Sequence, residues 1–321
     1  GFAGLNTQDS PAAMDIAFAS IADNCIIDKA GRISSRKGFQ AYTENPEVLG
    51  VSAGGLNVKP TSVTDPSAVA SVQEFVAEDG TAVLYCAGGL KLWVQNRDVP
   101  DRDLVELILP AAYTITANNW KIVPFNNNVY FFQATHPPLW LDYADDPTTL
   151  KLFPTNPLEG AVGFPNDAIA MRGHVWVGDF DLDKGVVAWS DTLIGHEWAT
   201  GDIGSLDLND VWPSGYDECT SMAAFNNFLI VFGKRTILVY EIPDTGPTGA
   251  SLRDTVVGIG NIARDAIQYT GSDLYFLDAT GVRMDGRTIQ EKSMPLGDIS
   301  YNVRSDIKAA IAATDPAVIR S

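Results

Sequence analysis

The feature that most constrains this sequence is one short pattern that occurs five times. In its clearest copy, two runs of apolar, β-branched and aromatic residues, 228–232 and 236–240, flank the turn Gly233-Lys234-Arg235. Such side chains suit a pleated sheet and glycine permits a tight reversal, so the pattern predicts a β-hairpin. The other copies occupy residues 81–94, 128–143, 174–191 and 273–284.

The five copies recur at an almost constant spacing. If Val83, Val129, Val175, Phe228 and Leu274 are equivalent positions, the steps between them are 46, 46, 53 and 46 residues. A strand candidate also precedes each copy, at 71–76, 120–125, 167–171, 220–225 and 266–269, and the small polar turn Asn126-Asn127-Asn128 joins the second candidate to its hairpin. Units of about 40 to 50 residues with about four strands each are typical of β-propellers. The sequence therefore predicts an all-β fold, a β-propeller with six blades when complete. A β-sandwich or two small β domains would share the strands without explaining the spacing.

The repeats divide the chain into three predicted regions. Residues 1–66 form an amino-terminal docking arm, a hairpin around Lys29-Ala30-Gly31 and a linker, and residues 67–298 form the blades with irregular insertions. Residues 299–321 form a short helix-prone segment. Because no closing strand pattern follows the fifth copy, we expect this segment to lead into a further carboxy-terminal part of a longer product. The arm is expected to dock on a neighbouring protein or on the rim of the domain.

The chain is strongly acidic, with 40 acidic against 22 basic side chains and a formal net charge of −18. Such a surface repels phosphate, which argues against tight nucleic-acid binding. The acidity either lines a passage along which DNA slides without sticking or simply keeps the protein in solution. Three widely spaced cysteines, Cys25, Cys86 and Cys219, argue against a disulfide framework and for folding in a reducing cytosol. No apolar run approaches the roughly 20 residues of a membrane span.

Motifs for catalysis are scarce in the sequence. The three histidines, His136, His174 and His196, stand apart from one another, and no zinc, phosphate-loop or serine-nucleophile motif occurs. We therefore predict that the chain is not an enzyme, and we assign it no catalytic residue, no cofactor and no metal ligand.

One acidic run is a weaker candidate for a metal site. In residues 179–185 aspartate alternates at Asp179, Asp181 and Asp183, a pattern that can wrap Ca²⁺ in oxygen ligands. Gly185 falls one place later than in an EF-hand loop, Ser190 replaces the bidentate glutamate, and Lys184 adds a competing charge. An acidic hairpin tip is the alternative that we favour.

Three tryptophans, Trp189, Trp198 and Trp212, fall in or beside the longest step of the repeat. Large indole rings serve either core packing, which we favour, or contact with a partner. A propeller module that recognises glycans, peptides or a receptor would use exposed Trp198 and Trp212 as a stacking platform.

Three groups of residues form an ordered set along the chain. They are Gly4-Leu5-Asn6 with Ser10-Pro11, Asn24 and 31–38; Asn166-Asp167 through Arg172 with 175–178 and 187–191; and 225–236 with Tyr240-Glu241. In this order they resemble the tail nozzle proteins of short-tailed bacteriophages, also called tail tubular protein B, and the related packaged-DNA stabilisation proteins.

The resemblance implies a structural virion protein, located in the phage tail and made in the host cytoplasm. It implies a hexamer at the distal tail tube, attached to an adaptor or gatekeeper ring and adjacent to tail fibre or spike proteins. Such a ring retains genomic DNA and conducts it during ejection, and the family supplies no catalytic residue. Six copies would carry six times the negative charge, which repels the duplex from all sides. The binding module for glycans or a receptor remains the alternative, and an enzymatic propeller is third.

Overall fold

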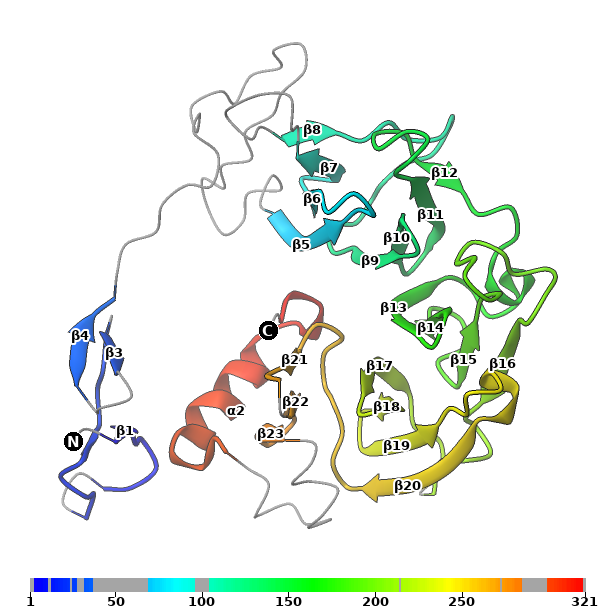
Figure 1. Cartoon of the computed structure of the whole chain (residues 1–321). Coiled ribbons are helices and arrows are strands. Elements are labelled where there is room, and N and C mark those ends of the chain that lie inside the picture. Colours follow the sequence, from blue (N-terminus) through cyan, green and yellow to red (C-terminus); the bar gives the residue numbers. More distant parts are fainter. Residues whose placement is uncertain are drawn as a thin grey trace. The chain divides into compact units, whose positions relative to one another are not determined.

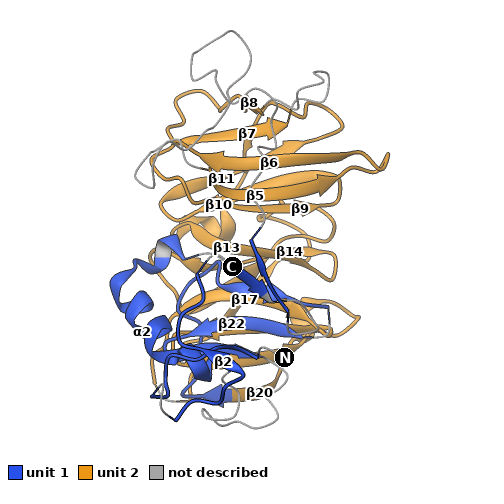
Figure 2. Cartoon of the chain, turned by 90° about the vertical axis from the view of Figure 1, so that its left-hand side faces the viewer, with its two compact units in different colours: residues 1–40, 256–321 blue, residues 41–255 orange. Residues whose placement is uncertain are grey.

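The structure is a computed structural model that describes residues 3–10, 13–23, 25–27, 32–36, 69–95, 104–213, 215–271, 273–284 and 299–319. The predicted linker, residues 44–66, lies outside these residues. The chain divides into two compact units, residues 41–255 and residues 1–40 with 256–321 (Figure 2).

Four antiparallel sheets follow one another along residues 69–257, each made of four strands that are consecutive in sequence. Blade 1 contains β5 (Val69–Val76), β6 (Ala82–Gly88), β7 (Lys91–Gln95) and β8 (Leu104–Glu106). Blade 2 contains β9 (Lys121–Phe125), β10 (Asn128–Gln133), β11 (His136–Asp142) and β12 (Lys151–Leu152). Blade 3 contains β13 (Pro165–Met171), β14 (His174–Phe180), β15 (Val186–Trp189) and β16 (Gly204–Asp207). Blade 4 contains β17 (Cys219–Phe225), β18 (Phe228–Gly233), β19 (Thr236–Glu241) and β20 (Ser251–Val257).

A fifth sheet belongs to the other unit and contains β21 (Ile267–Tyr269), β22 (Leu274–Asp278) and β23 (Gly281–Met284). All five predicted hairpins and the strand before each are therefore confirmed. The fold is a β-propeller with at least five blades, and the sixth blade stays a prediction. In Figure 1 the first strands of blades 1 to 4, β5, β9, β13 and β17, lie on the inner side of their arc. Short 3₁₀ turns, η1 (Pro157–Gly160) and η2 (Pro247–Gly249), lie in the connections.

Asparagine pairs form the turns between the first two strands of blades 2 and 4. Asn126 and Asn127 have φ angles of 47° and 59°, and Asn226 and Asn227 have φ angles of 49° and 67°. Two successive residues with positive φ define the type I′ turn, whose twist matches that of the flanking strands. Asparagine tolerates this backbone conformation better than other residues with a side chain. The polar turn predicted after the first strand of blade 2 thus has a direct physical reason.

The hydrophobic core consists of layers between neighbouring blades. Tyr130 and Phe132 of β10 pack with Val175 and Val177 of β14 in the layer between blades 2 and 3. The intervening Trp176 points the other way and belongs to the layer between blades 3 and 4. All seven residues of β14 are buried. Each inner sheet therefore buries both faces, which explains why the strands read as continuous apolar runs without polar alternation.

The second unit joins the amino-terminal arm to the carboxy-terminal segment. Strands β1 (Gly4–Leu5) and β2 (Phe18–Ala19) are parallel, and β3 (Cys25–Ile27) and β4 (Ile33–Ser35) form the predicted antiparallel hairpin. The helix-prone run is confirmed as α2 (Arg304–Ala313), which lies between η3 (Tyr301–Val303) and η4 (Pro316–Val318).

Backbone and side-chain hydrogen bonds hold the arm to this segment. Thr7 N donates to the carbonyl oxygen of Asn302 at 2.8 Å, and Gln8 Nε2 donates to Ser305 Oγ at 2.5 Å. The arm therefore contacts the residues at the start of α2 in the same chain. No helix in the described part of the chain is long and apolar enough to cross a membrane.

Candidate functional site

A fully buried carboxylate, Asp167, connects the first strands of three consecutive blades. Its strand, β13, lies beside β9 of blade 2 and β17 of blade 4. Lys121 Nζ of β9 lies 3.0 Å from Asp167 Oδ1, and Met222 N of β17 donates to Asp167 Oδ2 at 2.7 Å. A buried charge is tolerated when it is paired and hydrogen-bonded, and Asp167 has both kinds of partner.

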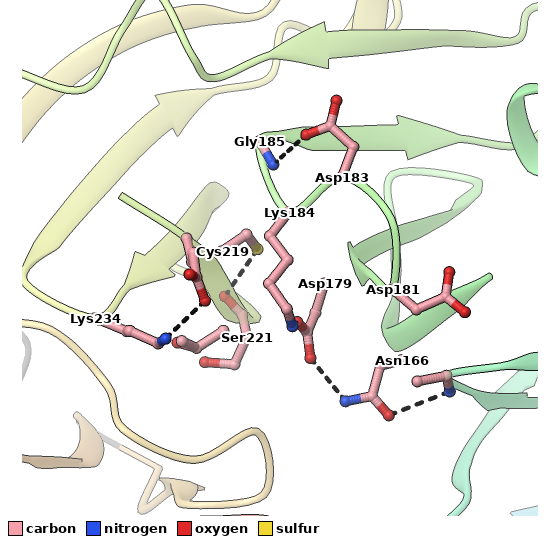
Figure 3. A network of polar contacts seen from close by, with 12 residues as sticks. Asn166, Asp179, Asp181, Asp183, Lys184, Gly185, Cys219, Ser221 and Lys234 are labelled. Atoms are coloured by element: carbon pink, nitrogen blue, oxygen red, sulfur yellow. Dashed lines mark hydrogen bonds and ion pairs between the residues drawn. The ribbon is translucent and has the colours of Figure 1, made fainter. Parts of the chain in front are cut away.

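A second buried acid, Asp179 of β14, is paired within blade 3. Lys184 Nζ contacts Asp179 Oδ1, and Asn166 Nδ2 donates to Asp179 Oδ2 at 2.7 Å (Figure 3). Burial raises the pKa of Asp179, and the adjacent Lys184 offsets part of that rise. Burial by itself lowers the pKa of Lys184, but the facing carboxylate raises it above its ordinary value.

A raised pKa favours the neutral, protonated form of Asp179. The raised pKa of Lys184, in contrast, depends on a negatively charged Asp179 beside it. We favour the ion pair for two reasons. The carboxylate has two donors, and the ammonium keeps 36% of its side-chain surface exposed, so its charge is partly solvated.

The other aspartates of the candidate calcium run serve different partners. Asp181 Oδ1 accepts from Phe164 N at 2.7 Å, and Asp181 Oδ2 accepts from Thr135 N in the β10–β11 turn of blade 2 at 3.0 Å. Asp183 Oδ1 accepts from Gly185 N at 2.9 Å. Within the described ranges, no three acidic, histidine or cysteine side chains are grouped so that they could hold a metal ion. The run extends from the end of β14 through the turn to β15, and its carboxylates bind other groups of the protein itself.

A glycine, Gly163, allows the backbone that precedes β13 to approach the carboxylate of Asp181. Gly163 has a φ of 86°, and a Cβ placed there would lie 1.6 Å from Asp181 Oδ1. The backbone before β13 can therefore pass this close to the carboxylate only because residue 163 has no side chain.

The turn from β14 to β15 also reaches blade 4. The carbonyl oxygen of Lys184 accepts a hydrogen bond from Cys219 N at 2.9 Å. We call the set that links blades 2, 3 and 4 the polar seam; its side chains are Lys121, Asn166, Asp167, Asp179, Asp181 and Lys184. Figure 3 labels Asn166, Asp179, Asp181 and Lys184 of this set. Their arrangement satisfies buried polar groups at the blade boundaries, so the seam is suited to fixing the blades against one another.

Next to the seam, one carboxylate holds the turn that the sequence singled out. Asp217 accepts from Lys234 N at 3.1 Å and from Arg235 N at 3.0 Å, and Lys234 Nζ pairs with Glu218 at 2.6 Å. The turn Gly233-Lys234-Arg235 is therefore confirmed between β18 and β19 and is fixed by a residue that precedes β17.

The three tryptophans of the long step are buried. Trp189, Trp198 and Trp212 are 3%, 4% and 5% exposed, respectively. Trp198 packs in the layer between blades 2 and 3, whereas Trp189 and Trp212 pack in the layer between blades 3 and 4. Core packing is confirmed. The alternative of an exposed stacking platform at Trp198 and Trp212 is wrong, because both rings are buried.

The three histidines lie in separate surroundings. His136 Nε2 accepts from Thr116 N at 3.0 Å, and His174 Nδ1 lies 2.7 Å from the carbonyl oxygen of Ser190. His196 stacks on Trp140 with a centroid distance of 3.7 Å and an interplanar angle of 9°. Burial lowers the pKa of His196, the first of several influences on it. The structure does not bring the three imidazoles together.

Sequence reasoning named Asp167 only as part of a strand and of a family motif, and it did not single out Lys121. One signal could have identified Asp167, namely an acidic residue inside a run that otherwise reads as a buried strand. Aspartate is almost never fully buried without a partner, so such a residue marks a paired position. The identity of the partner depends on how the blades are aligned.

Comparisons with known proteins find similarity at the level of fold. No family model matches the sequence, and no curated protein matches it either. The WD40 domain of Pan2 from Neurospora crassa matches with 9% identity and a TM-score of 0.40 over 66% of this chain, which spans 60% of that domain. A functionally unknown protein from Desulfotomaculum acetoxidans matches with 10% identity and a TM-score of 0.44, covering 68% of each chain. Virginiamycin B lyase from Staphylococcus aureus matches with 12% identity and a TM-score of 0.39, over 67% of this chain and 70% of the lyase.

Proposed function

We propose that this chain is a structural subunit of a short-tailed bacteriophage tail. In this role it forms part of the distal nozzle that retains packaged DNA and conducts it during ejection. Its partners are further copies of itself, an adaptor or gatekeeper ring, and tail fibre or spike proteins, and it acts without catalysis. The observation that carries the proposal is the position of Asn166 and Asp167, which belong to one of the residue groups that resemble the nozzle family.

Both residues belong to the polar seam. Asp167 links three blades, and Asn166 donates to the buried Asp179. Buried polar groups that are ion-paired or hydrogen-bonded across blade boundaries favour a single arrangement of the blades and oppose their sliding. A tube that retains packaged DNA needs subunits whose blades do not slide past one another.

Other residues of the same groups contribute packing. Trp176, Val177 and Trp189 of blade 3 and Val231 and Phe232 of blade 4 are all buried. In blades 3 and 4 the residues of the resemblance therefore build sheets and pack neighbouring sheets together. The net charge of −18 adds a second argument, because an acidic wall repels the phosphate backbone and lets it pass.

Immunogold labelling of purified phage particles tests the location. An antibody raised against this chain should label the distal end of the tail, and the same antibody preabsorbed with the chain serves as the control. Label confined to the capsid, or purified particles without label, would contradict the proposal.

A gel shift with duplex DNA tests the passage. At physiological salt the chain should leave the duplex unretarded, because its charge repels phosphate. A variant with twelve exposed aspartates and glutamates changed to lysine, which changes the net charge from −18 to +6, is the matched control and should retard the DNA. Tight binding by the unaltered chain would oppose a role as a conduit.

A further inference from the structure

The hairpin β3–β4 exposes apolar side chains on both of its faces. Its register pairs Ile26 with Ser34 and Ile27 with Ile33, so Ile26 and Ile33 lie on opposite faces. Ile26 is 48% exposed and Ile33 is 52% exposed. Ile16 and Ile21, which precede the hairpin, are 99% and 76% exposed. Four exposed isoleucines within 18 residues indicate a surface for contact with another protein segment.

The hairpin also lacks further strands. Among the described residues, β3 and β4 pair only with each other. A lone two-stranded hairpin is marginally stable in water, and its open edges can accept a strand from another chain. In the described part of the chain Ile26 and Ile33 stay exposed, so a partner that covered them would stabilise the hairpin.

The charge of this region differs from that of the remaining chain. The first 40 residues contain four aspartates and four basic residues, so the whole net charge of −18 belongs to residues 41–321. The basic residues are concentrated in 29–37, where Lys29, Arg32, Arg36 and Lys37 occur without an acidic residue. An acidic surface is the complementary partner for such a segment.

We propose that the β3–β4 hairpin docks on the acidic propeller of a second copy of this chain. The proposal rests on the proposed function in one respect, that the chain works as an assembly of copies. The isoleucines supply the apolar contact, and the flanking cations meet the acidic surface of residues 41–321. Exchange of the hairpin between neighbours would join successive copies head to tail, which closes into a ring when the rotation between copies permits.

Sedimentation velocity over a range of protein concentrations tests the docking. The unaltered full chain should self-associate, and the double variant Ile26→Asp with Ile33→Asp should weaken association at least about tenfold. Leu182→Asp is the matched control, because Leu182 is also exposed, at 75%, but lies at the β14–β15 tip. Its association should equal that of the unaltered chain. The double variant Arg32→Glu with Arg36→Glu should weaken association and reduce its dependence on salt.

Hydrogen exchange supplies a second readout that does not depend on the variants. Backbone amides of β3 and β4 should become more protected as the protein concentration rises. The proposal is overturned if the unaltered chain keeps the mass of one copy at every concentration. Association that survives both double variants, or a protected hairpin in a single copy, also overturns it. If the antibody labels the tail but the hairpin does not drive association, the proposed function stands and the docking proposal fails. If association depends on the hairpin but the antibody does not label the tail, the docking proposal stands and the proposed function fails.

Discussion

Met222 N donates a hydrogen bond of 2.7 Å to Asp167 Oδ2 across the boundary between blades 3 and 4. The other oxygen of the same carboxylate faces Lys121 of blade 2. One side chain thus couples three units of the repeat, in addition to the apolar layers through which neighbouring blades pack. Removal of this carboxylate should affect the joining of blades more than the folding of any one sheet.

Asp167→Ala should lower the free energy of unfolding by about 2–3 kcal/mol, because a buried N–H loses a charged acceptor and Lys121 loses its partner. Asp167→Asn should cost less, since the amide oxygen can still accept from Met222. Asp244→Ala is the control, because that carboxylate is 87% exposed and pairs only with Arg172 among the described contacts; it should change stability little. Urea unfolding measures all three. Equal stability of Asp167→Ala and Asp244→Ala would show that the seam contributes nothing.

Asn227→Val should destabilise blade 4 by about 1–2 kcal/mol, because a β-branched residue is strained at a φ of 67°. Asn227→Gly, the matched control, should cost less than about 1 kcal/mol, since glycine adopts positive φ freely. Thermal unfolding followed by circular dichroism compares the two. If valine were tolerated as well as glycine, the type I′ turn would not be the conformation in solution.

Cys86 and Cys219 should resist alkylation in the native protein. Burial raises the pKa of Cys86 to about 11 and raises that of Cys219 as well, so neither forms the reactive thiolate near neutral pH. Cys25 is only partly buried and should react first. Iodoacetamide labelling with mass spectrometry distinguishes the three sites, and labelling in urea is the control that should modify all of them. Native modification of Cys219 at the rate of Cys25 would contradict the buried position.

Acidification should weaken the contact between blade 2 and the 190–203 insertion. Burial lowers the pKa of His196 below its ordinary value of 6.5, while Glu197 and Asp142 raise it and Lys151 lowers it. The folded state therefore binds fewer protons than the unfolded state, so stability falls as the pH drops through about 6.5 and levels off below the folded pKa.

The melting temperature between about pH 8 and pH 5.5 measures this effect. His196→Gln removes the titrating ring, and its melting temperature should fall less over this interval than that of the unaltered chain. Identical pH profiles for the two proteins would exclude His196 as a source of the dependence.

The sequence predicted the repeating elements because their causes are local. The apolar runs on both sides of Gly233-Lys234-Arg235 and the asparagines at 126 and 127 act within a few residues of themselves, so spacing and turn chemistry sufficed. The same local reasoning identified α2. The sequence favours burial of Trp198 but does not indicate the pair of blades between which its ring packs.

The polar seam could not be predicted in this way. Asp167 and Met222 are 55 residues apart, and Thr135 and Asp181 are 46 residues apart. Their meeting depends on the register of each sheet and on the rotation between sheets, which are fixed by the packing of side chains such as Tyr130 and Val175. The aspartates at 179, 181 and 183 look alike in the sequence, and only the folded chain assigns them to three different partners.

The layered core has a consequence for how this molecule can change over time. Because Val175 and Trp176 of one strand pack in opposite layers, deleting blade 3 would expose an apolar face on each of its two neighbours. Substitutions at successive positions of a strand such as β14 alter the packing against one neighbouring sheet and then against the other. Variation should therefore accumulate in connections such as 190–203, where a loop can lengthen or acquire new side chains while the stack beneath it stays intact.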